Sequence, residues 1–252
     1  MKIGSTGIAI ITSGLLITSS NVLADEGWKF RLAPYMWFAG LEGDVGPLKN
    51  VPSSDVDISP SDALDDTDSS FMLIFDARKG LHGIFTDIFY SDLTSTEKID
   101  SATSTKLRST TKTTMITAAY TYSVLQDNFT NVDLMAGARW WRIDADVKLK
   151  SQIPALNLAG DNTESWFDPF IGVRGRMPIS GSNFYVNGNA SYGGFDINAK
   201  SFYEVSANLG YRWTKEIDTL VGYRQFDLDY DKNDFKYDAK QSGWQIGLVW
   251  SF

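Results

Sequence analysis

The end of the chain alternates between large apolar and mostly small or polar side chains. One face carries Trp244, Ile246, Leu248, Trp250 and Phe252, and the other carries Gln245, Gly247, Val249 and Ser251. A period of two residues predicts a β-strand with one apolar face. Soluble sandwich strands alternate too, but two tryptophans and a terminal phenylalanine on one face are unusual there. The pattern therefore favours a strand that faces lipid.

The same alternation recurs along the chain and predicts ten strands. They span 28–40, 69–78, 83–96, 111–124, 132–149, 166–177, 183–195, 202–213, 217–230 and 242–252. After residue 25 no segment keeps a helical period or stays apolar for 18 residues, which excludes helical membrane spans. An even number of antiparallel strands returns both termini to one side, as in single-chain bacterial barrels. Eight or twelve strands also fit, because the ends of the longer strands are not sharply marked.

The connections between these strands alternate in length. Short ones span 79–82, 126–131, 179–182 and 214–216, and long ones span 41–68, 97–110, 150–165 and 231–241, although 196–201 is brief. Short periplasmic turns and longer extracellular loops are typical of outer-membrane barrels, whereas a two-sheet sandwich has no reason to alternate. With no linker and no longer repeat, one domain is expected. The sequence predicts an all-β fold, a single closed antiparallel up-and-down transmembrane β-barrel.

The predicted outer wall is apolar, with aromatic residues near both membrane interfaces. The candidate outward sets are Phe30, Leu32, Met36 and Phe38; Phe71, Leu73 and Phe75; Ile84, Ile88 and Tyr90; Ile116, Ala118, Tyr120 and Tyr122; and Val205, Leu209, Tyr211 and Trp213. If the chain starts in the periplasm, one rim gathers Trp28, Tyr122, Tyr211, Trp213, Trp250 and Phe252. The other rim gathers Phe38, Trp140 and Trp244. Two such girdles are expected of a membrane barrel.

The first residues read as an export signal. Lys2 precedes an interrupted apolar run that ends at Val22-Leu23-Ala24, which predicts a signal peptide over residues 1–24 and a mature barrel over 25–252. The run is too short and too polar for a spanning helix. Removing it takes away one lysine, so the charge changes from −8 to −9, with 22 basic against 31 acidic residues. This excludes a strongly basic nucleic-acid surface, and the absence of cysteine excludes disulfides and thiolate chemistry.

The signal peptide, the ten amphipathic segments and the ending Trp250-Ser251-Phe252 resemble those of bacterial outer-membrane β-barrel proteins. The likeness covers the whole mature chain. It implies a Gram-negative cell envelope, and Trp250 and Phe252 are similar to the C-terminal signal read by the barrel-assembly machinery. The pieces Trp37-Phe38-Ala39-Gly40, Asp168 to Arg174 and Gly222-Tyr223-Arg224 look like those of small-barrel members to which no activity is assigned. The resemblance therefore implies an architecture and no activity.

The predicted inward faces are unusually charged. Alternation places there Lys29, Arg31, Arg78, Arg139, Arg174, Arg176, Arg212 and Arg224 against Asp76, Asp87, Asp168 and Glu204. Eight cations and four anions cannot be buried without partners, so they either pair across the lumen or line water. The first alternative is a salt-bridged filling of side chains, since small barrels are just filled by them. The second is a narrow, porin-like, anion-favouring pore for small solutes.

The inventory of catalytic side chains argues against an enzyme. Outer-membrane barrel enzymes commonly place a histidine beside a serine or a carboxylate, because imidazole moves protons near neutral pH. The single histidine, His82, falls in a predicted periplasmic turn, at the wrong end for an extracellular active site. Inward carboxylates have basic neighbours, so ion pairing is their expected role. We expect no catalytic residue, no metal and no cofactor.

The first long connection, residues 41–68, is strongly acidic. It holds eight acids and one base, and Ser59-Pro60-Ser61-Asp62 reads as an N-cap, a proline at the first helical position and an early acid. Asp65-Asp66-Thr67-Asp68 lacks the spacing of a calcium loop, so divalent-cation binding stays open. A solvated loop is one interpretation. The other is a lid, with Asp62, Asp65, Asp66 or Asp68 facing Arg139 or Arg224 across the mouth.

Together these patterns predict a non-enzymatic outer-membrane barrel with both termini in the periplasm. Its role is structural or surface-interacting, and the pore is the alternative. The expected partners are outer-membrane lipid and lipopolysaccharide, and the barrel-assembly machinery during biogenesis; nucleic acid is not among them.

Overall fold

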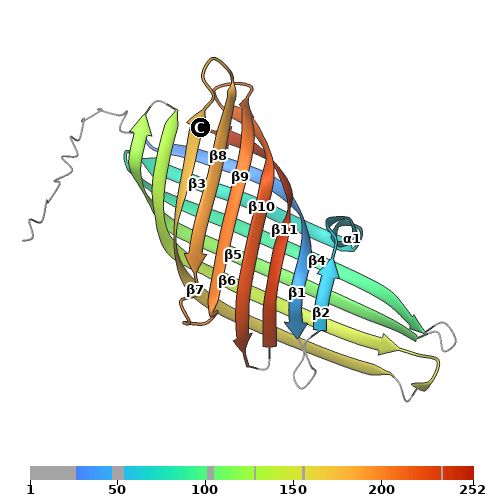
Figure 1. Cartoon of the computed structure of the whole chain (residues 1–252). Helices are drawn as coiled ribbons and strands as arrows, with labels where there is room; N and C mark the ends of the chain where they lie inside the picture. Colours follow the sequence, from blue (N-terminus) through green and yellow to red (C-terminus); the bar gives the residue numbers. More distant parts are fainter. Residues whose placement is uncertain (1–26, 47–53, 101–104, 128, 155–156, 234) are drawn as a thin grey trace, which may run out of the picture.

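The computed structural model describes residues 27–46, 54–100, 105–127, 129–154, 157–233 and 235–252, so the predicted signal peptide lies outside the described residues. Within these ranges the chain forms one antiparallel sheet that closes on itself (Figure 1). No helix in the described ranges is long and apolar enough to cross a membrane.

The wall is built from consecutive antiparallel strands. The elements in chain order are β1 (Lys29–Gly46), β2 (Ser54–Ile58), α1 (Pro60–Asp65), β3 (Thr67–Lys79), β4 (His82–Asp100), β5 (Thr105–Asp127), β6 (Thr130–Lys150), β7 (Leu158–Pro178), β8 (Phe184–Gly193), β9 (Ser201–Arg212), β10 (Ile217–Lys232) and β11 (Phe235–Ser251). Each strand from β3 to β11 pairs with the next, and β1 pairs with both β3 and β11. The prediction of a ten-stranded, closed up-and-down barrel is confirmed, with β2 as an additional short strand.

Several strands continue far into the predicted loops. β4 runs to Asp100 and β5 starts at Thr105, so most of the expected loop 97–110 is hairpin, and β7 starts at Leu158 within the expected loop 150–165. The sequence did not predict these extensions because both of their faces are polar. A strand with two polar faces shows no alternation of apolar and polar residues. Threonine-rich strands still form a ladder there, because β-branched side chains fit a pleated sheet.

Burial alternates along the strands as the sequence predicts. On β5, for example, Met115 and Thr117 are buried, whereas Tyr120 and Tyr122 are exposed. We call the end near Lys29 and Ser251 proximal and the opposite end distal. At the proximal end Phe30 stacks on Phe252, with ring centroids 5.7 Å apart, and the two residues exchange backbone hydrogen bonds that help to close the barrel. Farther along the wall Phe38 lies opposite Trp244, near the start of the distal girdle.

β1 and β3 separate partway along the wall. β1 pairs with β3 only from Lys29 to Pro34, and with β2 from Leu41 to Val45. Between them, Tyr35–Gly40 of β1 pairs with β11 alone, and Ser69–Met72 of β3 pairs with β4 alone. We call these two facing segments the β1–β3 seam. Pro34 lies at the proximal end of the seam. A proline is tolerated in a sheet mainly at edges and irregularities, because it has no N–H to donate.

Candidate functional site: the barrel interior

The inward side chains are arranged in layers along the barrel. From the proximal to the distal end, β1 carries Arg31, Tyr35 and Trp37, β6 carries Asp133, Arg139 and Trp141, and β10 carries Asp218, Arg224 and Phe226. Three strands thus give the same order, with two polar or charged positions followed by an aromatic ring. The interior consists of a proximal charge layer, a central charge layer and a distal aromatic layer.

Two buried aspartates organise the proximal charge layer. Asp133 is fully buried and accepts hydrogen bonds from Arg78 Nη1 at 3.0 Å, Arg174 Nε at 3.0 Å and Ser123 Oγ at 2.7 Å. Arg174 also pairs with Asp76, which accepts from Arg31 Nη2 at 2.9 Å. The result is a continuous chain of alternating charge across four strands. Such a chain satisfies guanidinium groups that would otherwise be buried unpaired.

Asp218 organises the rest of this end. It accepts from Arg176 Nη2 at 2.8 Å, and Arg212 Nε lies 3.8 Å from its second oxygen. The Arg176 guanidinium also lies over the Tyr185 ring, 3.6 Å from the ring centroid. The planar guanidinium group suits both contacts at once.

The central charge layer is more deeply buried. Arg139 Nη2 and Arg224 Nη2 donate to the same Glu204 oxygen, at 2.8 and 3.0 Å. Arg224 also lies 3.3 Å from Asp87 and donates to the Tyr35 hydroxyl at 2.9 Å, while that hydroxyl donates to Asp87 at 2.8 Å. Both arginines are only 3% exposed. Residues from β1, β4, β6, β9 and β10 are therefore tied together across the lumen.

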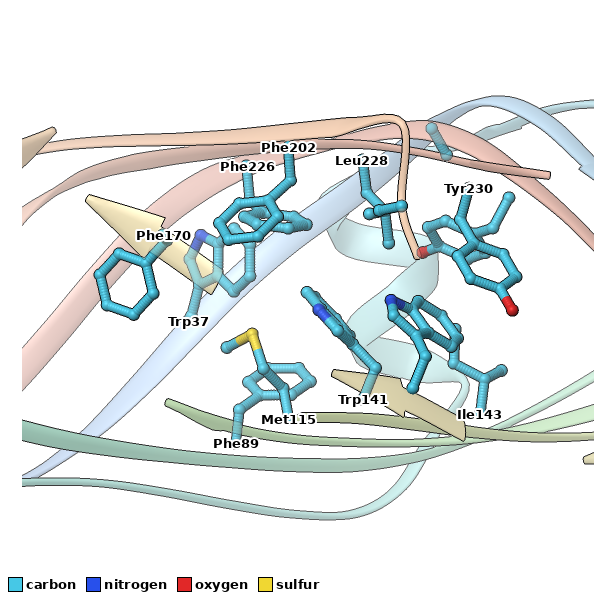
Figure 2. Close-up of a cluster of buried hydrophobic side chains, with 14 of the residues drawn as sticks. Trp37, Phe89, Met115, Trp141, Ile143, Phe170, Phe202, Phe226, Leu228 and Tyr230 are labelled. Carbon is cyan, nitrogen blue, oxygen red and sulfur yellow. The ribbon is translucent and has the colours of Figure 1, made fainter. Parts of the chain in front are cut away.

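Distal to this layer the lumen is filled by aromatic side chains. Figure 2 shows Phe202, Phe226, Leu228 and Tyr230 projecting from one wall toward Met115, Trp141 and Ile143 on the other. The rings are in contact, with Trp166 stacked on Tyr230 at 3.9 Å between centroids and Trp141 5.1 Å from Phe226. We call this set the aromatic layer: Trp37, Phe89, Met115, Trp141, Trp166, Phe170, Phe202, Phe226, Tyr230 and Phe235.

A cavity of about 140 Å³ lies on the proximal side of the aromatic layer. Its polar lining includes guanidinium groups, carboxylates and side-chain amides, from residues Arg31, Arg174, Arg176, Arg224, Asp76, Asp87, Glu204, Asn131, Asn187, Asn189, Asn208 and Gln245. A cavity of this size has room for several water molecules. The aromatic layer lies between the cavity and the distal end.

The structure places all twelve charged residues of the predicted interior on inward positions, but it groups them unevenly. Lys29 is exposed and forms no ion pair among the described residues. Asp168, expected in an ion pair, instead accepts hydrogen bonds from Trp166 Nε1 at 2.8 Å and from the backbone N–H of Ala199 at 2.9 Å. It holds the β8–β9 connection against β7.

Two important carboxylates were missed. Asp133 lies an even number of residues from Arg139 on β6, and Asp218 lies an even number from Arg224 on β10. Strand alternation therefore places both aspartates on the inward face. Adding these two aspartates to the twelve predicted residues gives eight cations against six anions, so the predicted excess of four positive charges falls to two.

The lid contacts predicted between Asp62, Asp65, Asp66 or Asp68 and the two arginines Arg139 and Arg224 are wrong. The predicted helix exists, and Ser59 caps it by accepting from the Asp62 N–H at 3.2 Å. However, β2 extends the wall beside β1, and the Asp66 carbonyl accepts from the Thr94 N–H of β4 at 2.8 Å. Arg139 and Arg224 pair with Glu204 and Asp87 instead. Residues 47–53 lie outside the described ranges.

The remaining candidates for chemistry lie outside the lumen. His82 is exposed at the proximal start of β4, and its Nδ1 is hydrogen-bonded to the outward-facing Tyr120 hydroxyl. In the described part of the chain, no group of three or more histidine, aspartate or glutamate side chains is placed to hold a metal ion.

Ion pairs on the outer wall begin distal to the aromatic girdle. Lys112 pairs with Asp92, Arg142 with Asp144, Lys148 with Asp146, Lys236 with Asp44 and Lys240 with Glu42. Partial burial raises the pKa of Asp144, but hydrogen bonds from Arg142 and Thr163 outweigh this, and the pKa lies below its ordinary value. A hydrogen bond to Asp44 raises the pKa of Lys236. The outer surface thus changes from apolar to charged within two to four residues along these strands.

Comparison with known proteins identifies the fold. No protein-family model matches the sequence, and a search of curated proteins finds no match. The outer membrane protease OmpT from Escherichia coli has a similar structure, with a TM-score of 0.55 at 11% identity, covering 90% of this chain and 97% of that one. Ail from Yersinia pestis gives a TM-score of 0.38 at 12% identity, covering 90% and 100%. The likeness to the OmpT structure shows that this chain has the fold of a bacterial outer-membrane β-barrel protein.

Proposed function

We propose that this protein is a non-enzymatic β-barrel of the bacterial outer membrane, closed to solute flow along its axis, with a structural or surface-interaction role. The aromatic layer is the observation that carries this proposal. Trp141, Phe202, Phe226 and Tyr230 are each at most 3% exposed although they line the interior of a barrel. In a water-filled channel these rings would be exposed to water, as the polar linings of porin lumens are.

The outer wall supports the membrane placement. Its apolar band lies between a proximal girdle that includes Trp28, Trp213 and Trp250 and a distal girdle that includes Trp140 and Trp244. Aromatic rings at both edges of an apolar band are typical of membrane barrels. We place the termini in the periplasm, because long extracellular hairpins and short periplasmic turns are the usual arrangement. The long β4–β5 and β6–β7 hairpins then lie outside the cell, where they offer a surface to partners.

The position of His82 supports a role without catalysis. It projects from the outer wall, away from the inward carboxylates that a proton-transfer mechanism would use. Asp76, Asp87, Asp133 and Glu204 are each held by arginine. A general base must reach its substrate and carry a free lone pair, and these carboxylates have theirs occupied by guanidinium groups.

A narrow pore is the second candidate, favoured by the charged cavity, where four arginines face the carboxylates of Asp76, Asp87 and Glu204. The two functions differ in conductance. In planar bilayers we expect no steady single-channel current from the folded barrel, because the aromatic layer interrupts the water path. Replacing Trp141 and Phe226 together by alanine is expected to produce measurable channels with a preference for anions.

The control for this experiment is the double replacement of Trp244 and Trp250 by alanine. Both residues lie on the outer wall, so their replacement removes a similar ring area without changing the lumen. Steady anion-selective current through the unaltered protein would contradict the closed barrel and favour the pore.

The membrane placement implies the partners that we propose: outer-membrane lipid, lipopolysaccharide and, during biogenesis, the barrel-assembly machinery.

Phe252, at the end of the chain, also helps to close the wall through its stacking on Phe30. Deleting Phe252 is expected to lower the amount of folded barrel in the outer membrane several-fold, measured by the heat-dependent gel shift of closed barrels. Deleting Phe252 should have little effect on refolding in detergent if assembly is the step affected, and an equal loss in both assays would assign it a purely structural role.

A further inference from the structure

Four buried donor atoms lie at the border between the central charge layer and the aromatic layer. Among the described residues, Trp37 Nε1, Trp141 Nε1, Arg139 Nη1 and Arg224 Nε have no hydrogen-bond partner. All four side chains are more than nine-tenths buried. The Arg224 guanidinium carbon lies 4.8 Å from the Trp37 ring centroid, the Arg139 carbon lies 5.9 Å from that of Trp141, and both arginines bind one Glu204 oxygen. The four donors therefore belong to one connected region.

Their chemistry specifies what would satisfy them. Buried donors are almost always paired in proteins, because an unpaired one keeps the full cost of losing water. All four atoms donate, so the missing partner is an acceptor. Glu204 and Asp87 already balance the two guanidinium charges. A ligand that fits this region carries a neutral oxygen acceptor, and the surrounding rings call for an apolar body.

The β1–β3 seam offers a way to this region. Trp37 lies within the seam segment of β1, between the last β1–β3 pair, Pro34 with Leu73, and the point where Ile58 and Pro60 pack against Gly40. A Cβ atom on residue 40 would lie 2.6 Å from the Ile58 carbonyl oxygen, so glycine permits this close packing. Strand edges in a membrane are normally paired. The seam is consequently the part of the wall that can separate without breaking a β1–β3 ladder.

We propose that the β1–β3 seam is a lateral entrance from the membrane to the four donors, and that the ligand is a neutral amphiphile with an apolar chain and a ketone or ester oxygen. This inference rests on the membrane placement proposed above. It is compatible with a lumen that is closed along its axis, because the route passes through the wall. Two outward residues of the seam, Met36 and Phe71, are apolar and more than half exposed, as an entrance from lipid requires.

The donor site is tested with 2-dodecanone and dodecane as probes. Added to the folded barrel in detergent, 2-dodecanone is expected to bind at least tenfold more tightly than dodecane, measured by the rise in the thermal midpoint. Trp37→Phe keeps a ring but removes one donor, and should weaken ketone binding roughly fivefold to tenfold. Trp244→Phe, on the outer wall, is the matched control and should leave it unchanged. Equal affinity for the two probes would overturn the donor site.

The entrance is tested with cysteine pairs, which the chain permits because it has no native cysteine. Met36→Cys with Phe71→Cys spans the seam, and Leu32→Cys with Phe75→Cys spans positions already paired below it. A short reducible thiol cross-linker across the first pair is expected to slow ketone binding at least tenfold, with recovery after reduction. The second cross-link should have no effect. Equal rates for both pairs would overturn the lateral entrance. The heat-dependent gel shift confirms that each variant is a folded barrel, which separates these outcomes from a failure of the membrane placement.

Discussion

Replacing Asp133 by asparagine is expected to lower the free energy of unfolding by about 3–5 kcal/mol. Asp133 is fully buried and serves two arginines, Arg78 and Arg174, together with Ser123. Asparagine has nearly the same shape but no charge, so both guanidinium groups would lose part of their neutralisation in a poorly hydrated place. Breaking a buried pair is costly because the other charge remains. Urea unfolding from phospholipid vesicles, followed by tryptophan emission, measures the change.

The matched control is Asp146→Asn. Asp146 pairs with Lys148 at 2.7 Å, but the two side chains are 38% and 46% exposed. An exposed pair contributes about 1 kcal/mol or less, since water and salt screen it. We therefore expect a change below about 1 kcal/mol for this variant. Similar losses for the two variants would mean that the proximal charge layer is hydrated and does not stabilise the barrel.

Placing arginine at Ile171 is expected to cost about 2–4 kcal/mol. Ile171 lies on the outer face of β7 and is 59% exposed, between Phe167 near the distal girdle and Met177 toward the proximal end. In lipid this position lies near the middle of the apolar band. A guanidinium group there must reach an interface or draw water into the bilayer, and both are unfavourable. The measurement is again the unfolding free energy in vesicles.

Ser165→Arg is the control for the wall. Ser165 lies on the same face of the same strand, but on the distal side of Phe167, where the outer surface has become polar. We expect a change of about 0–1 kcal/mol at this interfacial depth. If arginine is tolerated equally at both positions, the apolar band does not lie where the girdles place it.

The layered interior is consistent with our proposal that this charged lumen is closed along its axis. Inward charges are often the mark of a water-filled channel, but here Glu204 serves two arginines and Asp133 serves two more. The charges are therefore largely neutralised within their own layers, and the rings distal to them are buried. The axial closure that we propose leaves the wall as the remaining route inward. The β1–β3 seam is one irregular part of that wall.

The sequence by itself determined the local features of this protein. Alternation located all ten wall strands and the correct faces, so Leu209 points outward and Arg224 inward as predicted. The helix cap at Ser59 was also predicted, since it depends on neighbouring residues alone. These features follow from periods of two or a few residues, which the order of side chains records directly.

The tertiary structure alone decided which inward groups meet. Arg139 lies opposite Asp168 on the neighbouring strand, yet it pairs with Glu204 from β9, because strand tilt and stagger set which heights face each other across the lumen. The same holds for β2, which is placed by pairing with β1 and not by any pattern of its own. Alternation assigns a side chain to a face but gives no height along the barrel. Charge pairing, the aromatic layer and the seam all depend on that height, so they emerged only when the strands closed.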